Sequence, residues 1–527
     1  MTNKKIAIYD DSLRQLDAKY RVFESLCVKG LPCHDLEGME AWFIAELKNF
    51  AQRYPIKALA VSAHGATFVC VGRDNKCVVP CVLYTHEPSL TDDDFHRRFY
   101  KRFGKPEELQ ERTGTPAFKA MINPAKGLFF AREQFSEEFK KVRAVLPYPQ
   151  YWGLRFTGKT GVESTYMGNH TYLWDQIDHT LSAVAEQLGI ASLIPVAAAS
   201  SNASTALRKS WDVLGTISAD FASATGLAKE TIVTMGIHDS NSALLPHFAT
   251  KGSGGFILNS TGTWCVIMNP VDSYGFAPDE LGKVVFFNIS AFGAPIKTAI
   301  FLGGQEFETW SRLIQKKFER ADLPGWDEEL YRAILKEKRL FLLPELTPGS
   351  GQFPHSRARI IEDGITYYFD DLSSTDPRPP TSDSQLPIPD SPFPTPNSSF
   401  LIPHSPYESL FAALCISLVM QTLTALERTG IAKNTEVCTE GGFRKNEAYN
   451  RLLTSALADN KVYLTDIAEA TALGAAMTAK MAMSGKSLAE LAGDFRIDYT
   501  EQVKCSLPEL ESYRQAWLDA TGMDCRG

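Results

Sequence analysis

Apolar and polar positions along the chain follow two periods in turn, one typical of strands and one typical of helices. Continuous apolar runs at 58–62 (ALAVS) and 231–235 (TIVTM) predict parallel strands that are buried on both faces. Between them, apolar residues recur at helical spacing, as at 38–50. Strands that alternate with helices in this way predict an α/β architecture.

The same reasoning predicts the remaining main elements. Strands are expected at 5–10, 255–258 and 435–438, a hairpin from 66–71 and 78–83, and helices at 180–188, 305–318, 446–459 and 468–483. A nearly all-apolar run at 410–426 predicts a buried helix, which follows Ser405-Pro406-Tyr407-Glu408, a sequence typical of a capping box.

The length of the chain requires more than one hydrophobic core. The 527 residues exceed the roughly 250 at which single cores stop growing, so we expect two domains. A boundary at 246–253 divides them into 1–247 and 248–500, followed by a C-terminal tail at 501–527. Residues 373–404 are rich in Pro and Ser, which predicts a disordered surface insertion, with a proline-motif ligand for a partner as the alternative.

Composition and charge exclude several classes of protein. The net charge of −8 argues against binding to nucleic acid. No apolar run reaches the roughly 20 residues that span a bilayer, and charged residues stand where a signal peptide needs its apolar stretch. Ten cysteines are scattered without a C-x-x-C pair, which favours reduced thiols over a zinc site. We therefore expect a cytoplasmic protein.

The strand at 231–235 runs directly into Gly236-Ile237-His238-Asp239-Ser240. Catalytic groups collect at the carboxyl ends of strands in open α/β sheets. Asp239 could accept a proton there as a general base. It could equally cap the helix that begins near Asn241.

Three glycine-containing junctions follow later in the chain. Asn259–Trp264 combines hydroxyls with a glycine turn, where backbone N–H groups can converge on phosphate, although a plain hairpin turn has the same sequence. Gly303-Gly304 and Gly441-Gly442 each lie between a strand and a helix, where a phosphate or a flat ligand can approach the backbone. Ordinary strand-to-helix turns are the alternative for both. No Walker loop occurs.

The order of these motifs resembles that of the FGGY family of carbohydrate kinases over nearly the whole chain. The resemblance includes 62–67 (SAHGAT), 154–174, 236–243 (GIHDSNSA), 260–264 and 441–446, together with 469–475 (EATALGA). It is closest in style to the L-fuculose and L-rhamnulose kinase branch. It implies two actin-like, ribonuclease H-like ATPase domains, with sugar bound in the first domain and ATP in the cleft between the two.

The resemblance also implies roles for individual residues. Asp239 would be the base that deprotonates the attacking hydroxyl, and His64, Gly65 and His238 would contact the sugar. The ATP phosphates would lie against Gly262, Thr263 and Gly304, and the adenosine against Gly442 and Asn446. ATP and Mg²⁺ are the expected cofactors, with no metal ligand assigned. A ketose or deoxyketose is the expected substrate, and neither nucleic acid nor membrane is an expected partner. A homodimer is compatible with the family.

The N-terminus departs from the family pattern. Family members open with a strand that ends in Asp-x-Gly, whereas residues 2–10 resemble the turn and second strand that follow it. We expect either a start codon placed too late or a degenerate kinase. Two alternatives to an active sugar kinase therefore stay open, namely a pseudokinase that binds sugar and nucleotide, and a non-sugar member of the actin-like ATPase superfamily.

Overall fold

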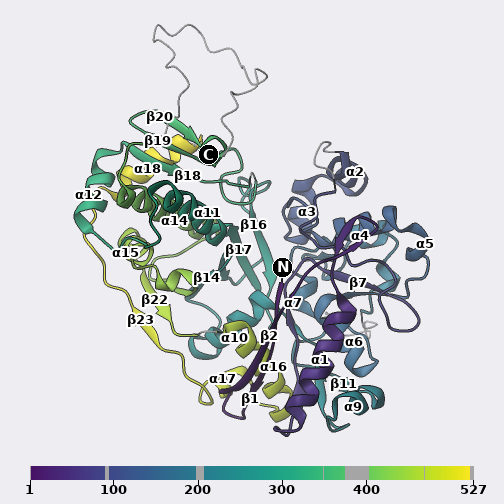
Figure 1. Cartoon of the computed structure of the whole chain (residues 1–527). Helices are drawn as coiled ribbons and strands as arrows, with labels where there is room; N and C mark the ends of the chain where they lie inside the picture. The colour runs from purple at the N-terminus through teal and green to yellow at the C-terminus, as the bar shows by residue number, and fades with distance from the viewer. Residues whose placement is uncertain are drawn as a thin grey trace.

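The computed structural model describes residues 2–88, 94–196, 207–347, 349–373, 403–467 and 469–522. The chain forms two lobes of strands covered by helices (Figure 1). This confirms the predicted α/β architecture. The Pro/Ser-rich insertion expected at 373–404 falls largely on residues outside the described ranges.

The first lobe is built on short parallel strands. The apolar run 58–62 divides into β5 (Ala58–Leu59) and β6 (Ser62–Ala63), which pair in parallel with β12 (Ile232–Thr234) and β13 (Ile237–His238), respectively. The break between β12 and β13 coincides with Gly236. This residue has a φ of +85°, and an added Cβ would lie 3.0 Å from the carbonyl oxygen of Val61, so the turn requires glycine.

β1 (Thr2–Tyr9) and β2 (Gln15–Phe23) form an antiparallel ribbon, which confirms the strand predicted at 5–10 and extends it. In the described part of the chain, β1 pairs only with β2, and β5 only with β12. The ribbon reaches the second lobe, because Lys5 Nζ lies 3.3 Å from a carboxylate oxygen of Glu469.

Two predictions for the first lobe hold only in part. The expected hairpin forms next to its turn, where Gly72 N donates to Lys76 O and Val78 N donates to Cys70 O, but its longer ladder joins β7 (Phe68–Val71) to β8 (Ala144–Pro147). Pro80 lies in the expected partner segment 78–83 and cannot donate to a ladder. The helix expected at 180–188 begins later, as α8 (Ala183–Gln187), because the hydroxyl of Ser182 caps it by accepting from Ala185 N.

The second lobe contains a seven-stranded sheet in the order β16-β17-β15-β14-β21-β22-β23. At its centre β14 (Phe256–Thr261) runs parallel to β21 (Glu436–Gly441) and antiparallel to β15 (Cys265–Pro270). The outer strands are β16 (Val285–Ile289), β17 (Pro295–Phe301), β22 (Lys461–Thr465) and β23 (Tyr499–Glu501). The strands predicted at 255–258 and 435–438 are both confirmed.

Four helices of this lobe agree with the sequence analysis to within a few residues. They are α11 (Gly303–Phe318), α14 (Tyr407–Arg428), α15 (Glu447–Ala456) and α16 (Ala470–Ser484). In the first lobe, α1 (Leu36–Ala51) covers the helix predicted at 38–50. Long helices are the most predictable elements, because their apolar periodicity extends over several turns.

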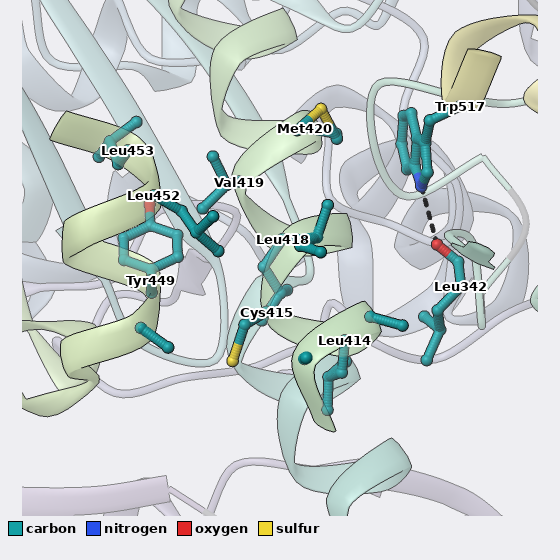
Figure 2. Close-up of a cluster of buried hydrophobic side chains, with 14 of the residues drawn as sticks. Leu342, Leu414, Cys415, Leu418, Val419, Met420, Tyr449, Leu452, Leu453 and Trp517 are labelled. Carbon is teal, nitrogen blue, oxygen red and sulfur yellow. Dashed lines mark hydrogen bonds between the residues drawn. The ribbon is translucent and has the colours of Figure 1, made fainter. Parts of the chain in front are cut away.

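The core of the second lobe forms around α14. Its side chains pack against α15 and against α18 (Leu510–Thr521), whose Trp517 donates its indole N–H to the carbonyl of Leu342 at 2.9 Å (Figure 2). The residues beyond 501 therefore contribute buried side chains to this core. By length and composition alone α14 could cross a membrane, but the apolar window is 100% buried within the lobe, as in a core helix of a globular domain.

The capping box predicted before α14 does not form. The hydroxyl and backbone N–H of Ser405 both donate to the carboxylate of Glu362, and no side chain caps the helix. A partner distant in sequence thus replaces the local one.

The two lobes meet along α10 (Asp239–Lys251) and α16, which lie side by side (Figure 1). The helices approach closely at Gly474, where an added Cβ would lie 1.9 Å from the carbonyl oxygen of Ser242. The hydroxyl of Ser242 donates to the carbonyl of Thr471 at 2.7 Å. Because α10 begins with Asp239, this contact links the predicted base to the second lobe.

Candidate active site

Two motifs that are far apart in the sequence lie next to each other through one parallel strand pair. β6 pairs with β13, with Ser62 opposite Ile237 and Ala63 opposite His238. Both strands end at the same edge of the sheet, so His64 and Asp239 follow them at neighbouring positions. The structure therefore brings the predicted sugar contacts and the predicted base together.

Asp239 occupies the first position of α10 and keeps 39% of its side chain exposed. Its Oδ1 accepts from the backbone N–H of Ser240 at 2.7 Å. Burial of the carboxylate by surrounding protein raises its pKa to about 6, although hydrogen bonds from Ser240 and the charge of Lys4 act in the opposite direction. Asp239 is ionised at neutral pH and binds a proton more readily than an ordinary aspartate, which suits a general base.

The helix-capping alternative for Asp239 does not hold in its usual form. The N-cap residue of α10 is His238, and the Asp239 carboxylate bonds to the N–H of the next residue rather than to one two or three positions further on. The carboxylate therefore remains directed to a position where a substrate can reach it.

Four histidines form a cluster that reaches this carboxylate through His238, whose Nε2 lies 3.2 Å from Asp239 Oδ1. The rings of His34 and His64 lie 5.7 Å apart, and those of His170 and His238 lie 6.3 Å apart. Burial lowers the pKa values of His34, His170 and His238 to about 3, and that of His64 well below its usual value. All four rings are neutral at physiological pH, so they offer hydrogen bonds rather than charge.

Several buried polar atoms of this group have no hydrogen-bond partner in the described part of the chain. They are His34 Nε2, Ser62 Oγ, Asn169 Oδ1, His170 Nδ1 and His238 Nδ1. A buried polar atom without a partner costs about 1–3 kcal/mol, so such atoms are rare in folded proteins. A ligand that carries several hydroxyl groups would satisfy them.

Gly65 permits the close approach of the His64 loop to this cluster. A Cβ at Gly65 would lie 2.7 Å from Asn169 Nδ2 and 2.8 Å from His170 Nε2. The predicted role of Gly65 therefore has a steric basis, because any larger residue would displace these two side chains.

Lys4 contributes a positive charge to the same site. Its amino group lies 5.4 Å from the ring centre of Tyr148. Burial lowers the pKa of Lys4 to about 8, against the opposing charge of Asp239. Lys4, His34, Asn169 and His170 were not assigned a role from the sequence. Asn169 and His170 lie within 154–174, a segment of the family resemblance, whereas Lys4 and His34 belong to none of its segments.

A buried turn that follows Glu163 supports the two loops that carry His64 and His238. The hydroxyl of Tyr166 donates to the carbonyl of Thr67 at 2.6 Å, and Thr165 Oγ1 accepts from His238 N at 3.0 Å. Both residues follow Glu163, whose carboxylate accepts from the N–H groups of Thr165 and Tyr166. The positions of His64 and His238 therefore depend on one rigid segment.

A second group of predicted residues meets in the other lobe. Gly262 and Thr263 form the exposed tip of the β14–β15 hairpin, closed by Gly262 N donating to Trp264 O at 2.9 Å. Gly304 begins α11 against this tip, and a Cβ there would lie 1.9 Å from the carbonyl oxygen of Gly262. The motif at 259–264 is therefore a hairpin turn, which was the alternative interpretation of its sequence. This turn also packs against the N-terminus of the long helix α11.

Gly441 and Gly442 flank the same hairpin on its other side. Gly441 has a φ of +80°, and an added Cβ would lie 2.0 Å from the carbonyl oxygen of Thr261. Gly442 is exposed, and a Cβ there would lie 3.7 Å from the carbonyl oxygen of Thr261, an ordinary contact distance. Asn446 caps α15 by accepting from Tyr449 N at 3.0 Å, so its side chain already has a structural function.

These loops suit the phosphates of a nucleotide. The N-terminus of α11 has a positive dipole end, and the adjacent hairpin tip is exposed. Gln305 N of the first turn donates to Thr263 O of that tip at 3.2 Å. No group of three His, Cys, Asp or Glu side chains within the described ranges could hold a metal ion. Mg²⁺ usually binds through substrate phosphates and one or two carboxylates, so a protein cage is not required.

Models of one family match most of the chain. Residues 43–246 match the N-terminal domain of the FGGY family of carbohydrate kinases, and residues 253–367 and 394–483 match C-terminal domains of FGGY carbohydrate kinases. The chain belongs to the FGGY family of carbohydrate kinases. It is therefore a sugar kinase that uses ATP to phosphorylate a small-molecule sugar, which excludes a non-sugar member of the actin-like superfamily.

Solved structures share the fold over the whole length. A carbohydrate kinase from Novosphingobium aromaticivorans matches with a TM-score of 0.74 and 22% identity, over 99% of this chain and 96% of that one. Ligand-bound xylulose kinase from Lactobacillus acidophilus has a TM-score of 0.73 and 14% identity, over 99% and 96%. Plasmodium falciparum glycerol kinase with ADP has a TM-score of 0.73 and 14% identity, over 100% and 96%.

These likenesses confirm the predicted pair of actin-like, ribonuclease H-like domains. At such low identity they establish the fold and leave the substrate open. A search of curated proteins found no match to the chain.

Proposed function

We propose that the enzyme transfers the γ-phosphate of ATP to a hydroxyl of a ketose or deoxyketose, with L-fuculose, L-rhamnulose and xylulose as the model substrates. The observation that carries the proposal is the position of Asp239. A carboxylate of raised pKa lies beside buried polar atoms that lack partners. A general base next to a hydroxyl-binding pocket is the arrangement that sugar phosphorylation requires.

Asp239 accepts the proton of the attacking hydroxyl. His64 and His238 bind other hydroxyls of the sugar as neutral imidazoles, and Gly65 keeps room for the loop that carries His64. Because the rings are uncharged, they select a neutral polyol rather than an acid. Holding the hydroxyl at the base contributes to the rate mainly through orientation.

The ATP phosphates bind at Gly262, Thr263 and Gly304, and the adenosine binds along Gly442 and Asn446. The positive dipole end of α11 and the exposed hairpin tip orient the phosphates. Mg²⁺, bound with the nucleotide, neutralises charge on the β- and γ-phosphates. Closure of the lobes about α10 and α16 would exclude water from the transfer.

The test is ADP release, measured with purified protein against a panel of ketoses, with glycerol and gluconate included. We expect turnover with a ketose and little ATP hydrolysis without sugar. Binding of sugar and nucleotide without ADP release from any sugar would identify the pseudokinase alternative instead. A cytoplasmic location, a homodimer and the absence of membrane and nucleic-acid partners are also part of the proposal, and light scattering in solution tests the dimer.

A further inference from the structure

The edge strand β16 of the second lobe is docked on the first lobe. Gln110 of α3 (Pro106–Thr113) donates from Nε2 to the carbonyl of Val285 at 2.8 Å. The backbone N–H of Phe287 donates to the carbonyl of Gly114 at 2.9 Å. β16 is the outermost strand of its sheet and lies beside α3 (Figure 1). The second lobe therefore presents the side chains of β16 to the first lobe at a defined position.

Phe286 of this strand reaches the histidine cluster of the sugar site. Its ring lies 6.2 Å from the ring of His170, with an angle of 78° between the two planes. Phe118 of the first lobe completes the group, with its ring 5.8 Å from His170 and 5.6 Å from Phe286. All three pairs are edge-to-face, which is an arrangement that aromatic rings prefer at these distances. The ring of His170 therefore packs against one phenylalanine from each lobe.

Packing accounts for most of the orientation of the His170 ring. Phe118 and Phe286 are both buried, and Val284 and Ile300 of the second lobe belong to the same apolar cluster. The Nδ1 atom of His170 has no hydrogen-bond partner within the described ranges. A smaller side chain in place of Phe286 would therefore leave the ring less constrained.

The backbone of His170 is also held in a strained conformation. Its φ of +39° lies in the left-handed region, which residues other than glycine seldom occupy. Strain of this kind persists where surrounding contacts determine a residue's position, and it is concentrated at functional sites. The Nε2 atom of His170 lies next to the loop that carries His64, since a Cβ at Gly65 would come within 2.8 Å of it.

We propose that His170 binds a hydroxyl of the sugar and that Phe286 is a positioning residue, which holds the His170 ring for this contact. The sugar site is then complete only when the second lobe is docked on the first. A residue of the lobe that binds ATP therefore sets the affinity for the sugar. This inference rests on the proposed ketose kinase function.

Phe286→Leu and Phe287→Leu form a matched pair of variants. Successive residues of a strand point to opposite faces of the sheet. The ring of Phe287 packs 4.8 Å from that of Tyr274 and 4.9 Å from that of Phe276. Both phenylalanines are buried in β16, so both substitutions should lower the melting temperature by a similar amount. Only Phe286→Leu removes a ring from His170.

Calorimetry measures the dissociation constants of L-fuculose, L-rhamnulose and xylulose, and of ADP with Mg²⁺ as a probe of the nucleotide site. For the ketose that the wild type binds most tightly, Phe286→Leu should weaken binding by about ten-fold, because a displaced binding group loses its contact. Phe287→Leu should leave ketose binding close to the wild-type value, and ADP binding should be close to it in both variants.

A double-mutant cycle tests whether Phe286 acts through His170. His170→Ala should weaken ketose binding at least as much as Phe286→Leu does. Adding Phe286→Leu to His170→Ala should then cause no further loss, because the ring that Phe286 supports is already absent.

An equal loss of ketose binding in Phe287→Leu, or a further loss in the double variant, would show a general effect on the fold and overturn the inference. Wild-type binding in Phe286→Leu or in His170→Ala would also overturn it. The expected losses of binding without ADP release from any ketose would leave the inference standing and refute the proposed transfer to a ketose. A wild-type protein that binds no ketose would refute the proposed substrate, and the inference with it.

Discussion

The Nε2 atom of the buried His238 lies 3.2 Å from the Oδ1 atom of Asp239 and 2.6 Å from Nδ2 of Asn169. An uncharged ring thus lies between the proposed base and a buried amide, and its Nε2 can either donate to the carboxylate or accept from the amide. Because burial keeps His238 neutral, it does not neutralise the base as a cation at this position would. The first two predictions follow from this arrangement.

Asp239→Asn should lower kcat by about 10²–10⁴, because it removes the base but keeps the size and polarity of the side chain. Steady-state ADP release with a phosphorylated ketose measures the loss. The dissociation constant of the sugar should stay within a few-fold of the wild-type value, which calorimetry can check. Near-normal turnover in this variant would show that Asp239 is structural.

The pH dependence should follow the ionisation of Asp239. With a pKa of about 6, kcat/KM should rise as the pH increases through 6 and then level off. The pH-rate profile of the wild-type enzyme measures this limb. A limb near the ordinary aspartate value would contradict the assigned environment.

Ionisation of Asp239 should lower the stability of the folded protein as the pH rises, whereas it increases kcat/KM. The folded-state pKa of Asp239 is raised above its unfolded value, so the native state binds more protons than the unfolded state between about pH 4 and 6, and this contribution to stability falls as the pH rises. Asp239→Asn should therefore raise the melting temperature above about pH 6, and the gain should fade toward pH 4. Thermal unfolding across this pH range tests it, and a lower melting temperature at high pH would contradict it.

Substitutions at two glycines near the hairpin tip should distinguish a disturbed protein packing from a lost contact with the nucleotide. Gly304→Ala places a Cβ 1.9 Å from the carbonyl oxygen of Gly262, so the hairpin and α11 must move apart, and we expect the KM for ATP to rise at least about ten-fold. At Gly442 the nearest atom to an added Cβ is 3.7 Å away, so Gly442→Ala leaves the protein contacts intact. Any loss of ATP affinity in Gly442→Ala, at unchanged melting temperature, then reports direct contact with the nucleotide.

Replacing residues 374–402 with a short Gly/Ser linker should change the free energy of unfolding by less than about 1 kcal/mol, because the cost of closing a loop grows slowly with its length. The flanking residues are held independently. Ser373 Oγ donates to Asp370 O, and His404 N donates to Glu362. Denaturant unfolding and ADP release should both be close to wild-type values. Unfolding or lost turnover would show that the segment packs on the body of the protein.

The local sequence determined the elements whose signal lies within a few consecutive turns. The periodicity of 410–426 predicted the buried α14, and the apolar run before Gly236 predicted a strand that ends at the base. The glycines at 262, 304, 441 and 442 were recognisable because each lies directly after a predicted strand or in a turn. The close contacts that exclude a Cβ at Gly304 and Gly441 are made with distant residues and appear only in the fold.

Only the tertiary structure decided which distant residues meet. His34, Asn169 and His170 join His64 and His238 in one cluster, and the strand pairing and the Gly65 contact show which segments meet. Asn169 and His170 lie in a segment of the family resemblance, but nothing in that segment alone marks them as neighbours of His64. Tertiary contacts also replaced local preferences. Ser405 bonds to Glu362 instead of capping α14, and β7 forms its longer ladder with β8 rather than with the segment after its own turn. Hydrogen bonds are as strong to a distant partner as to a near one, so the packing of the whole chain selects between them.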